Sequence, residues 1–408
     1  MSVDTAIQAT ARPPRLWYAT FSGLCASLVG IGVARFAYTP LIPALIAAGW
    51  FTPAATAYLG AANLLGYLAG ALLGHGMTRW VRPIPLLKAM MLLTAASLFA
   101  CAFRDLGFVW FLVWRLISGY TGGVVMVVTP RAVLSVAPPS RRGLVAGTVF
   151  TGVGLGIAAA GTLVPFLLRL GGVTGAWLGL GALALLLTFA AWGGWPRAMA
   201  EPPAGPRAAN GQLFRRPVLI LLATYGLNAV GVVPPMIFLV LFIVHRLGLG
   251  LDAASFYFVL YGLGAAAGPV LAGRLADFLG FRLALRLACL VEAVAVAMLA
   301  LVPDPLAVGA SSLVVGALTP AVVPLAAGQS QLLGGTAEAG GRIWGYATTA
   351  YALAMALAAY FFSFLLDRGF DYGLPFEIGA AVLLAAFVLD LFLPDRRRPP
   401  SAANLPAA

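Results

Sequence analysis

Two arginines, Arg35 and Arg115, lie inside long apolar stretches of the sequence and have the clearest capacity for binding chemistry. A guanidinium group is permanently charged, and its planar N–H donors suit a carboxylate, a sulfonate or a phosphate. A charge at the centre of a bilayer costs about 2.5 to 3.5 kcal/mol on insertion scales, so such residues normally face a protein interior or a wet cavity. We therefore expect both arginines to face inward and take them as candidate contacts of an anionic ligand.

Other polar side chains recur at helical spacing in the apolar stretches and could contact the remainder of a ligand. They are Tyr38, Asn63, Tyr67, Tyr225, Asn228, Tyr257, Tyr261, Thr348 and Tyr351. For each tyrosine, packing or an interfacial position is an equally good explanation. Glu292 is the only acidic residue in the middle of an apolar stretch, which makes it the candidate proton carrier. The alternative is that Glu292 pairs with another helix or stays protonated.

The composition requires a membrane environment for these residues. Of 408 residues, 62% are hydrophobic and 9% are charged, and the mean hydropathy is +0.97. A helix needs ~20 apolar residues to cross a bilayer. We count twelve such spans, at 17–47, 54–74, 84–103, 106–129, 143–168, 174–195, 217–244, 253–273, 283–302, 305–327, 342–366 and 374–393. The sequence thus predicts an all-α integral membrane protein.

The distribution of basic residues predicts the topology. The net charge is +12, but the basic residues are spread over separate loops and form no single patch for nucleic acid. With a cytoplasmic N-terminus, nineteen Lys and Arg residues fall on the cytoplasmic side and four on the other, namely Arg104, Arg169, Arg246 and Arg368. We expect both termini in the cytoplasm. The first fifteen residues lack a signal-peptide pattern, so the first helix is expected to be its own membrane signal.

The spans divide into two halves of six. A polar segment rich in proline, 196–216, separates residues 1–195 from 217–394 and is expected to be a cytoplasmic linker, with 395–408 as a cytoplasmic tail. An offset of 199 residues aligns 53–58 with 252–257 and carries Gly74 onto Gly273. We expect two pseudo-symmetric six-helix halves.

Paired six-helix halves resemble the major facilitator superfamily of transporters, and short motifs support the likeness. The segment from Gly273 through Asp277 and Gly280 to Arg282 is similar to the superfamily's loop between the second and third helices of a half. The first-half counterpart keeps Gly74 and Arg79 but lacks the aspartate. The resemblance implies a gating role for these six residues, as a latch that forms in only one of two transport states.

A narrower resemblance lies in residues 30–70. The arginine and phenylalanine at 35 and 36, together with Asn63, Gly66 and Tyr67, resemble the YbfB/YjiJ-type group of bacterial major facilitator proteins. The segment from Arg115 to Gly119 is similar to a motif of the superfamily's fourth helix. The resemblance implies a bacterial inner-membrane location and a substrate site near the midplane, between halves that rock against each other.

In that fold the first, fourth, seventh and tenth helices line the cavity, which places Arg35 and Arg115 on cavity helices. The cavity-lining and supporting helices contain no acidic residue at mid-depth, so no carboxylate is expected to neutralise either arginine. A cationic drug would meet two like charges there. We therefore predict a small carboxylate-type anion as the substrate, with a proton able to travel beside it. The alternative partner is a backbone carbonyl freed by Pro40 or Pro43.

The function we expect is secondary active transport by rocker-switch alternating access. Efflux of amphipathic compounds is the main alternative, and a non-transporting receptor is a weaker one. Two histidines and three scattered cysteines, Cys25, Cys101 and Cys289, offer no catalytic or metal-ligand spacing. We expect no enzymatic activity, no metal and no cofactor, and a monomer whose partners are the lipid bilayer, a small-molecule substrate and, with coupling, protons.

Overall fold

The computed structural model describes residues 16–78, 80–138, 141–196, 215–302 and 304–392. These segments are helical with short connections, which confirms the predicted all-α class. The helices are α2 (Leu16–Ser27), η1 (Leu28–Phe36), α3 (Tyr38–Ala47), α4 (Pro53–Met77), α5 (Pro83–Ala100), η2 (Arg104–Leu106), α6 (Gly107–Leu134), α7 (Arg142–Ala190), α8 (Arg216–His245), α9 (Leu251–Leu279), α10 (Phe281–Leu301), α11 (Pro305–Gly334), α12 (Ala337–Asp367) and α13 (Leu374–Leu391).

Eleven helical segments of the described chain are long and apolar enough to cross a membrane. The longest, α7, has 49 residues and is interrupted by non-helical backbone at Gly171 and Gly172. A straight helix of that length would far exceed a hydrocarbon core of about 30 Å. At the two glycines α7 turns back, so it supplies both the fifth and the sixth crossing, and the twelve predicted crossings are present.

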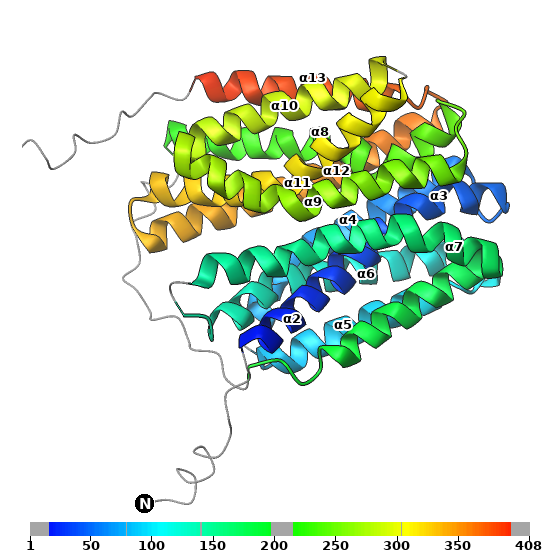
Figure 1. The fold of residues 1–408 in the computed structure, drawn as a ribbon, viewed down its shortest axis with the longest axis horizontal. Coiled ribbons are helices and arrows are strands. Elements are labelled where there is room, and N and C mark those ends of the chain that lie inside the picture. Colours follow the sequence, from blue (N-terminus) through cyan, green and yellow to red (C-terminus); the bar gives the residue numbers. More distant parts are fainter. Residues whose placement is uncertain (1–15, 79, 139–140, 197–214, 303, 393–408) are drawn as a thin grey trace, which may run out of the picture.

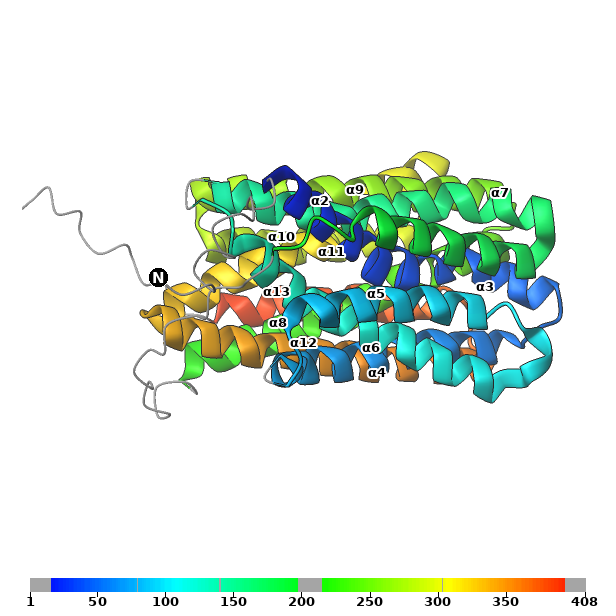
Figure 2. The same ribbon diagram turned by 90° about the horizontal axis from the view of Figure 1, so that it is seen from below.

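The helices lie in two groups (Figures 1 and 2). Helices α2 to α7 form the N-terminal group, and α8 to α13 form the C-terminal group. The groups meet where α7 packs on α9 and where α4 packs on α12. We name the end of the bundle where α7 ends and α8 begins the linker end, and the opposite end the far end.

The first crossing is not a regular α-helix. It consists of α2, a nine-residue π-helix η1 that contains Arg35, and then α3. Pro40 and Pro43 lack backbone N–H groups, so the carbonyls four residues before them lose their usual helical partner. A π-helical stretch shifts the hydrogen-bonding ladder by one residue and commonly marks a functional site. The first crossing is therefore distorted, and the distorted stretch, η1, lies before the two prolines.

Glycines allow close helix packing both within and between the groups. Gly66 and Gly70 of α4 contact α6, and Gly264 and Gly268 of α9 contact α11, so these pairs pack helices within one group. The interface of the groups contains Gly154, which lies against Ala266 of α9.

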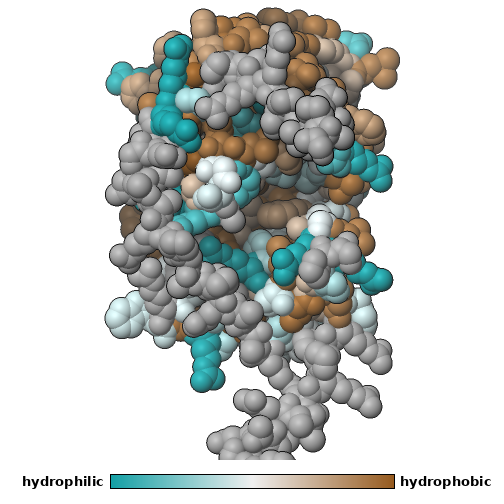
Figure 3. Space-filling model, turned by 90° about the vertical axis from the view of Figure 1, so that its left-hand side faces the viewer, coloured by the Kyte–Doolittle hydropathy of each residue, from teal (hydrophilic) through white to brown (hydrophobic). Residues whose placement is uncertain are grey.

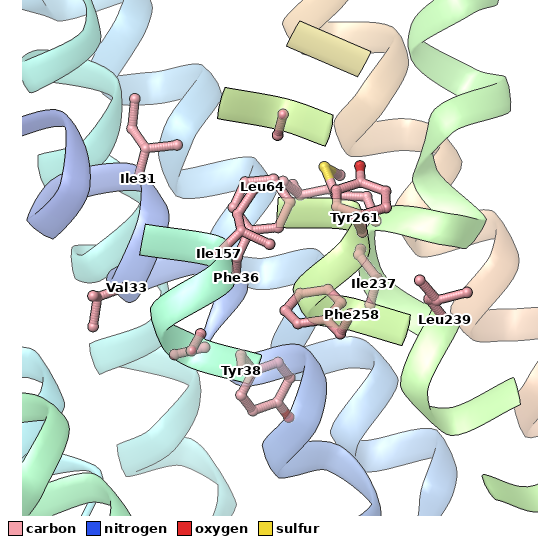
Figure 4. Packing of buried hydrophobic residues seen from close by; sticks show 14 of the residues in the cluster. Ile31, Val33, Phe36, Tyr38, Leu64, Ile157, Ile237, Leu239, Phe258 and Tyr261 are labelled. Carbon is pink, nitrogen blue, oxygen red and sulfur yellow. The ribbon is translucent and has the colours of Figure 1, made fainter. Parts of the chain in front are cut away.

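The far end of the bundle is closed. The stretch of α8 from Gly231 to Ile243 is buried on every side, and the Thr39 hydroxyl of α3 donates a hydrogen bond to the Met236 carbonyl of α8 at 2.9 Å. Figure 4 shows Phe36 and Ile157 of the N-terminal group packed near Tyr261, Phe258 and Ile237 of the C-terminal group.

Packing is looser toward the linker end. The side chains of Arg35, Tyr67, Thr348 and Tyr351 are only partly buried. Hydrophilic residues gather on this end, and its surface is hollowed between the two groups (Figure 3). The two ends of the bundle therefore differ in how tightly the groups pack against each other.

Candidate functional site

Arg35 projects from η1 into the space between the two groups. One terminal guanidinium nitrogen donates to the Met355 sulfur of α12 at 3.0 Å, and its Nε is buried without a partner. The guanidinium carbon lies 4.8 Å from the centre of the Tyr67 ring. No ion pair of Arg35 with a carboxylate occurs among the described residues. A thioether is a weak acceptor, so this cation retains most of its hydrogen-bonding capacity.

Arg115 is held quite differently. Its side chain is only 2% exposed and donates to the Ala34 carbonyl of η1 at 2.8 Å, while the guanidinium covers the Tyr38 ring at 4.2 Å. The sequence suggested two kinds of partner for the arginines, an anionic ligand or a backbone carbonyl. Arg115 has the backbone carbonyl. Arg35, which lies close to Pro40 and Pro43, bonds to a sulfur atom and not to a freed carbonyl.

Aromatic side chains from both groups surround Arg35. Tyr67, Tyr261 and Tyr351 all lie within electrostatic range of its guanidinium. The Tyr351 ring packs on Tyr225 with centroids 4.4 Å apart. The hydroxyls of Tyr67, Tyr225 and Tyr351 make no hydrogen bond with any described residue. Each of these hydroxyls therefore keeps its own hydrogen-bonding capacity, and their role as ligand contacts stays a prediction.

Glu292 lies at the centre of a polar network although its helix, α10, lies toward the periphery. The side chain is 0% exposed, and Asn228 of α8 donates to its Oε2 at 2.7 Å. Its Oε1 lies 3.3 Å from the Thr319 hydroxyl of α11, to which Tyr261 donates at 3.1 Å. Tyr351 lies within electrostatic range of both Glu292 and Arg35. Glu292 therefore forms hydrogen bonds with two other helices, which is the alternative to a proton carrier given above. It does so close to the site around Arg35.

Four predicted contact residues either lie away from Arg35 or already form hydrogen bonds within the protein. Tyr38 donates to the Thr56 carbonyl at 2.8 Å, and Asn63 donates to the Arg115 carbonyl at 3.3 Å. Tyr257 packs near Gly309 of α11. Thr348 bonds back to the Trp344 carbonyl at 2.9 Å. Tyr38 and Asn63 therefore support the Arg115 arrangement.

The predicted gating residues lie at the linker end. Gly74 is near the end of α4, and Gly280 ends α9 with a φ of 80°, a conformation that glycine adopts without strain. Asp277 is exposed and makes no ion pair or hydrogen bond with the described residues, while Arg282 lies within electrostatic range of Asp390. Gly273 has open space around it. Arg79 lies outside the described residues.

Several residues of the site were not predicted from the sequence. Met355 and Trp344 are apolar residues of α12, and Trp344 lies 5.9 Å from the Tyr225 ring. Thr319 of α11 connects Tyr261 with Glu292. Thr319 follows Glu292 by 27 residues, on another helix, so no local spacing could have linked the two.

Comparison with known families agrees with this architecture. Residues 27–391 match the family described as "Uncharacterised MFS-type transporter YbfB". The chain belongs to this family. It is thus a multi-pass membrane protein of the major facilitator type, and the resemblance noted in residues 30–70 is confirmed over most of its length.

Two curated relatives are described as uncharacterised transporters. The chain is 28% identical over 173 residues to the "Putative uncharacterized transporter YgaY" of Escherichia coli K12, covering 42% of this chain and 43% of that protein. The YgaY protein of E. coli O157:H7 matches to the same extent. The chain thus aligns with less than half the length of these curated relatives.

Solved structures show the same fold. The E. coli xylose transporter XylE, in a partially occluded inward-open conformation, superposes with a TM-score of 0.70 at 15% identity, covering 93% of this chain and all of that one (100%). A D-xylose-proton symporter superposes with a TM-score of 0.70 at 18% identity, covering 93% of this chain and 97% of the symporter. At such identities the likeness shows the fold and says nothing of the substrate.

Proposed function

We propose that this protein is a secondary active transporter that moves a small organic anion through alternating access of the site around Arg35. The main support is the environment of Arg35. This cation lies between the two groups, and its one hydrogen-bond acceptor among the described residues is a thioether. An anion would supply the strong acceptor that the protein does not. The closed far end and open linker end support alternating access.

Proton coupling through Glu292 is part of the proposal. Thr319 has a single hydroxyl hydrogen and two acceptors, the Val315 carbonyl at 2.8 Å and Glu292 Oε1 at 3.3 Å. The closer acceptor takes that hydrogen, which leaves room for a proton on Oε1 itself. Proton binding there, with an anion at Arg35, would give a charge-neutral load. Of the structures with this fold, one is described as a proton symporter.

The unequal number of arginines at the two ends of the bundle supports a membrane location and a topology. The linker end carries Arg141, Arg215 and Arg274 among many others, whereas the far end carries few. We propose that the linker end is cytoplasmic in a bacterial inner membrane, that residues 196–216 connect the two halves there, and that the protein is a monomer. The loop from Gly273 to Arg282 would then act as the cytoplasmic latch.

Efflux of amphipathic compounds remains the second candidate, favoured by the aromatic rings around Arg35. Orientation-controlled vesicles separate the two directions. A reporter fused after Ala408 tests the topology: a cytoplasm-active reporter should work, and activity of a periplasmic reporter alone would contradict it.

The function is tested with the purified full chain in proteoliposomes that enclose a pH-sensitive dye. External acetate, lactate, benzoate and succinate are added in turn, and proton entry is followed. At least one anion should drive proton entry in the wild type, and Arg35→Gln should abolish it. The matched control, Arg368→Gln at the exposed far end, should retain it. If neutral or cationic amphipaths are transported and no anion is, the proposal is wrong.

A further inference from the structure

We propose that the site around Arg35 binds one class of anion, a monocarboxylate with a flat and largely apolar body such as an aromatic acid. This inference rests on the anion-transport function proposed above and specifies its substrate class. Three features carry it: the number of available cations, the nature of the surrounding walls, and the polar groups that remain unpaired.

The site offers one positive charge. The sequence places two arginines at mid-depth, but Arg115 is only 2% exposed, and its guanidinium donates to the Ala34 carbonyl and lies against Tyr38 inside the N-terminal group. Arg35 alone reaches across to the other group, although the Nε atoms of both arginines are buried without a partner. A guanidinium edge matches one carboxylate in bidentate fashion. A second carboxylate on the same ligand would be desolvated without a partner cation, which is strongly unfavourable.

The walls around that charge are aromatic. Tyr67 lies beneath the guanidinium at 4.8 Å and Phe36 lies at 5.8 Å from it. The Tyr225 ring packs at a tilt against Tyr351, with ring centroids 4.4 Å apart, and against Trp344, with centroids 5.9 Å apart. Ring faces of this kind favour a planar, apolar partner in offset or edge-on contact, at about 0.5 to 1.5 kcal/mol per aromatic pair beyond its buried area. The rings come from both groups, so a flat body would contact both halves of the transporter.

The unpaired hydroxyls near Arg35 belong to tyrosines. The hydroxyls of Tyr67, Tyr225 and Tyr351 are without a hydrogen bond in the described chain. The amide nitrogens of both predicted asparagine contacts donate within the protein, Asn63 to the Arg115 carbonyl and Asn228 to Glu292, while the Asn228 Oδ1 is buried without a partner. A sugar or other polyol needs many paired donors and acceptors. The free hydroxyls suffice for the carboxylate and one further polar substituent.

The test is a matched ligand series on the purified full-length protein, measured by thermal shift and titration calorimetry. The probes are benzoate, terephthalate, acetate, succinate, benzamide and benzylammonium at millimolar concentrations. We expect benzoate to bind about tenfold more tightly than terephthalate or acetate, a difference of ~1.4 kcal/mol. Arg35→Gln should abolish the benzoate response, and Arg368→Gln should leave it unchanged.

The remaining outcomes separate this inference from the proposed function. If succinate or terephthalate binds best and requires Arg35, anion transport stands and the monocarboxylate inference fails. If acetate binds as well as benzoate, the aromatic walls contribute nothing and the inference fails. If only benzamide or benzylammonium binds, both proposals fail. If a folded protein responds to none of the six probes, the aromatic monocarboxylate class is excluded.

Discussion

The Arg115 guanidinium donates a 2.8 Å hydrogen bond to the Ala34 carbonyl, directly before Arg35 in the π-helical stretch. Ser118 of α6 also approaches this carbonyl oxygen at 3.4 Å. One arginine is therefore fixed by the protein and anchors the backbone that presents the other. This division of roles makes Arg115 a positioning residue and leaves the contact with substrate to Arg35.

Replacing Arg115 should accordingly act through Arg35. We expect Arg115→Gln to weaken benzoate binding about tenfold, because a misplacement of the order of 1 Å in a binding group is costly. Arg115→Lys, which keeps a charged donor, should recover part of the loss. Calorimetry on the wild type and the two Arg115 variants measures these losses. An Arg115→Gln loss as complete as that of Arg35→Gln, with no recovery in Arg115→Lys, would instead indicate that Arg115 contacts the anion itself.

Helix packing within the N-terminal group gives a second prediction. A Cβ added at Gly119 of α6 would overlap the Asn63 carbonyl oxygen of α4, so the two helices would have to separate. We expect Gly119→Ala to destabilise the protein by about 1 to 3 kcal/mol, seen as a lower midpoint of thermal unfolding in detergent. Gly273→Ala is the matched control, since nothing lies within 4 Å of its added Cβ. Equal midpoints for the two variants would show that the backbones are not in close contact.

The sequence predicted the helices well because hydrophobic length is the dominant constraint in a bilayer. The predicted span 305–327 begins where α11 does, at Pro305, and 374–393 begins with α13 at Leu374. Errors occur where helices extend past the hydrocarbon, as in α11, which continues to Gly334. Such polar extensions are stabilised by capping and by contacts at the linker end, which hydropathy does not detect.

The site was less predictable from the sequence. Arg35 stood out because a charge in an apolar run is conspicuous, and the tyrosines followed from helical spacing. Arg35 and Arg115 have different hydrogen-bond partners because the Ala34 carbonyl of the π-helical stretch lies close to α6. No pattern of residues in the sequence predicts that distance. Glu292 was conspicuous as an acid in an apolar stretch, but its contacts with Asn228 and Thr319 arise from three helices that meet only in the folded chain.

An exposed ion pair at the far end gives a third prediction. Arg169 of α7 and Asp252 of α9 form a 2.5 Å contact that joins the two groups, and both side chains are 69% exposed. Exposed pairs contribute about 0 to 1 kcal/mol, so Arg169→Ala should shift the conformational equilibrium toward far-end opening by less than about fivefold. A cysteine introduced by Ile237→Cys, buried beneath the closed end, should then be labelled faster by an impermeant thiol reagent. The charge-swapped pair Arg169→Asp/Asp252→Arg should restore slow labelling, and unchanged rates throughout would contradict a role in closure.

The carboxyl of Glu292 gives the prediction that most directly tests coupling. Glu292→Gln keeps an acceptor for Asn228 at nearly the same position but removes the group that can take up a proton. We expect the variant to bind the anion and to exchange labelled for unlabelled anion across proteoliposomes at close to the wild-type rate. Anion-driven proton entry and accumulation of the anion against its gradient should both be lost. Glu377→Gln, an exposed acid at the start of α13, is the matched control and should retain both. Proton entry that persists in Glu292→Gln would show that the proton travels by another route, and loss of exchange together with proton entry would make Glu292 a structural residue.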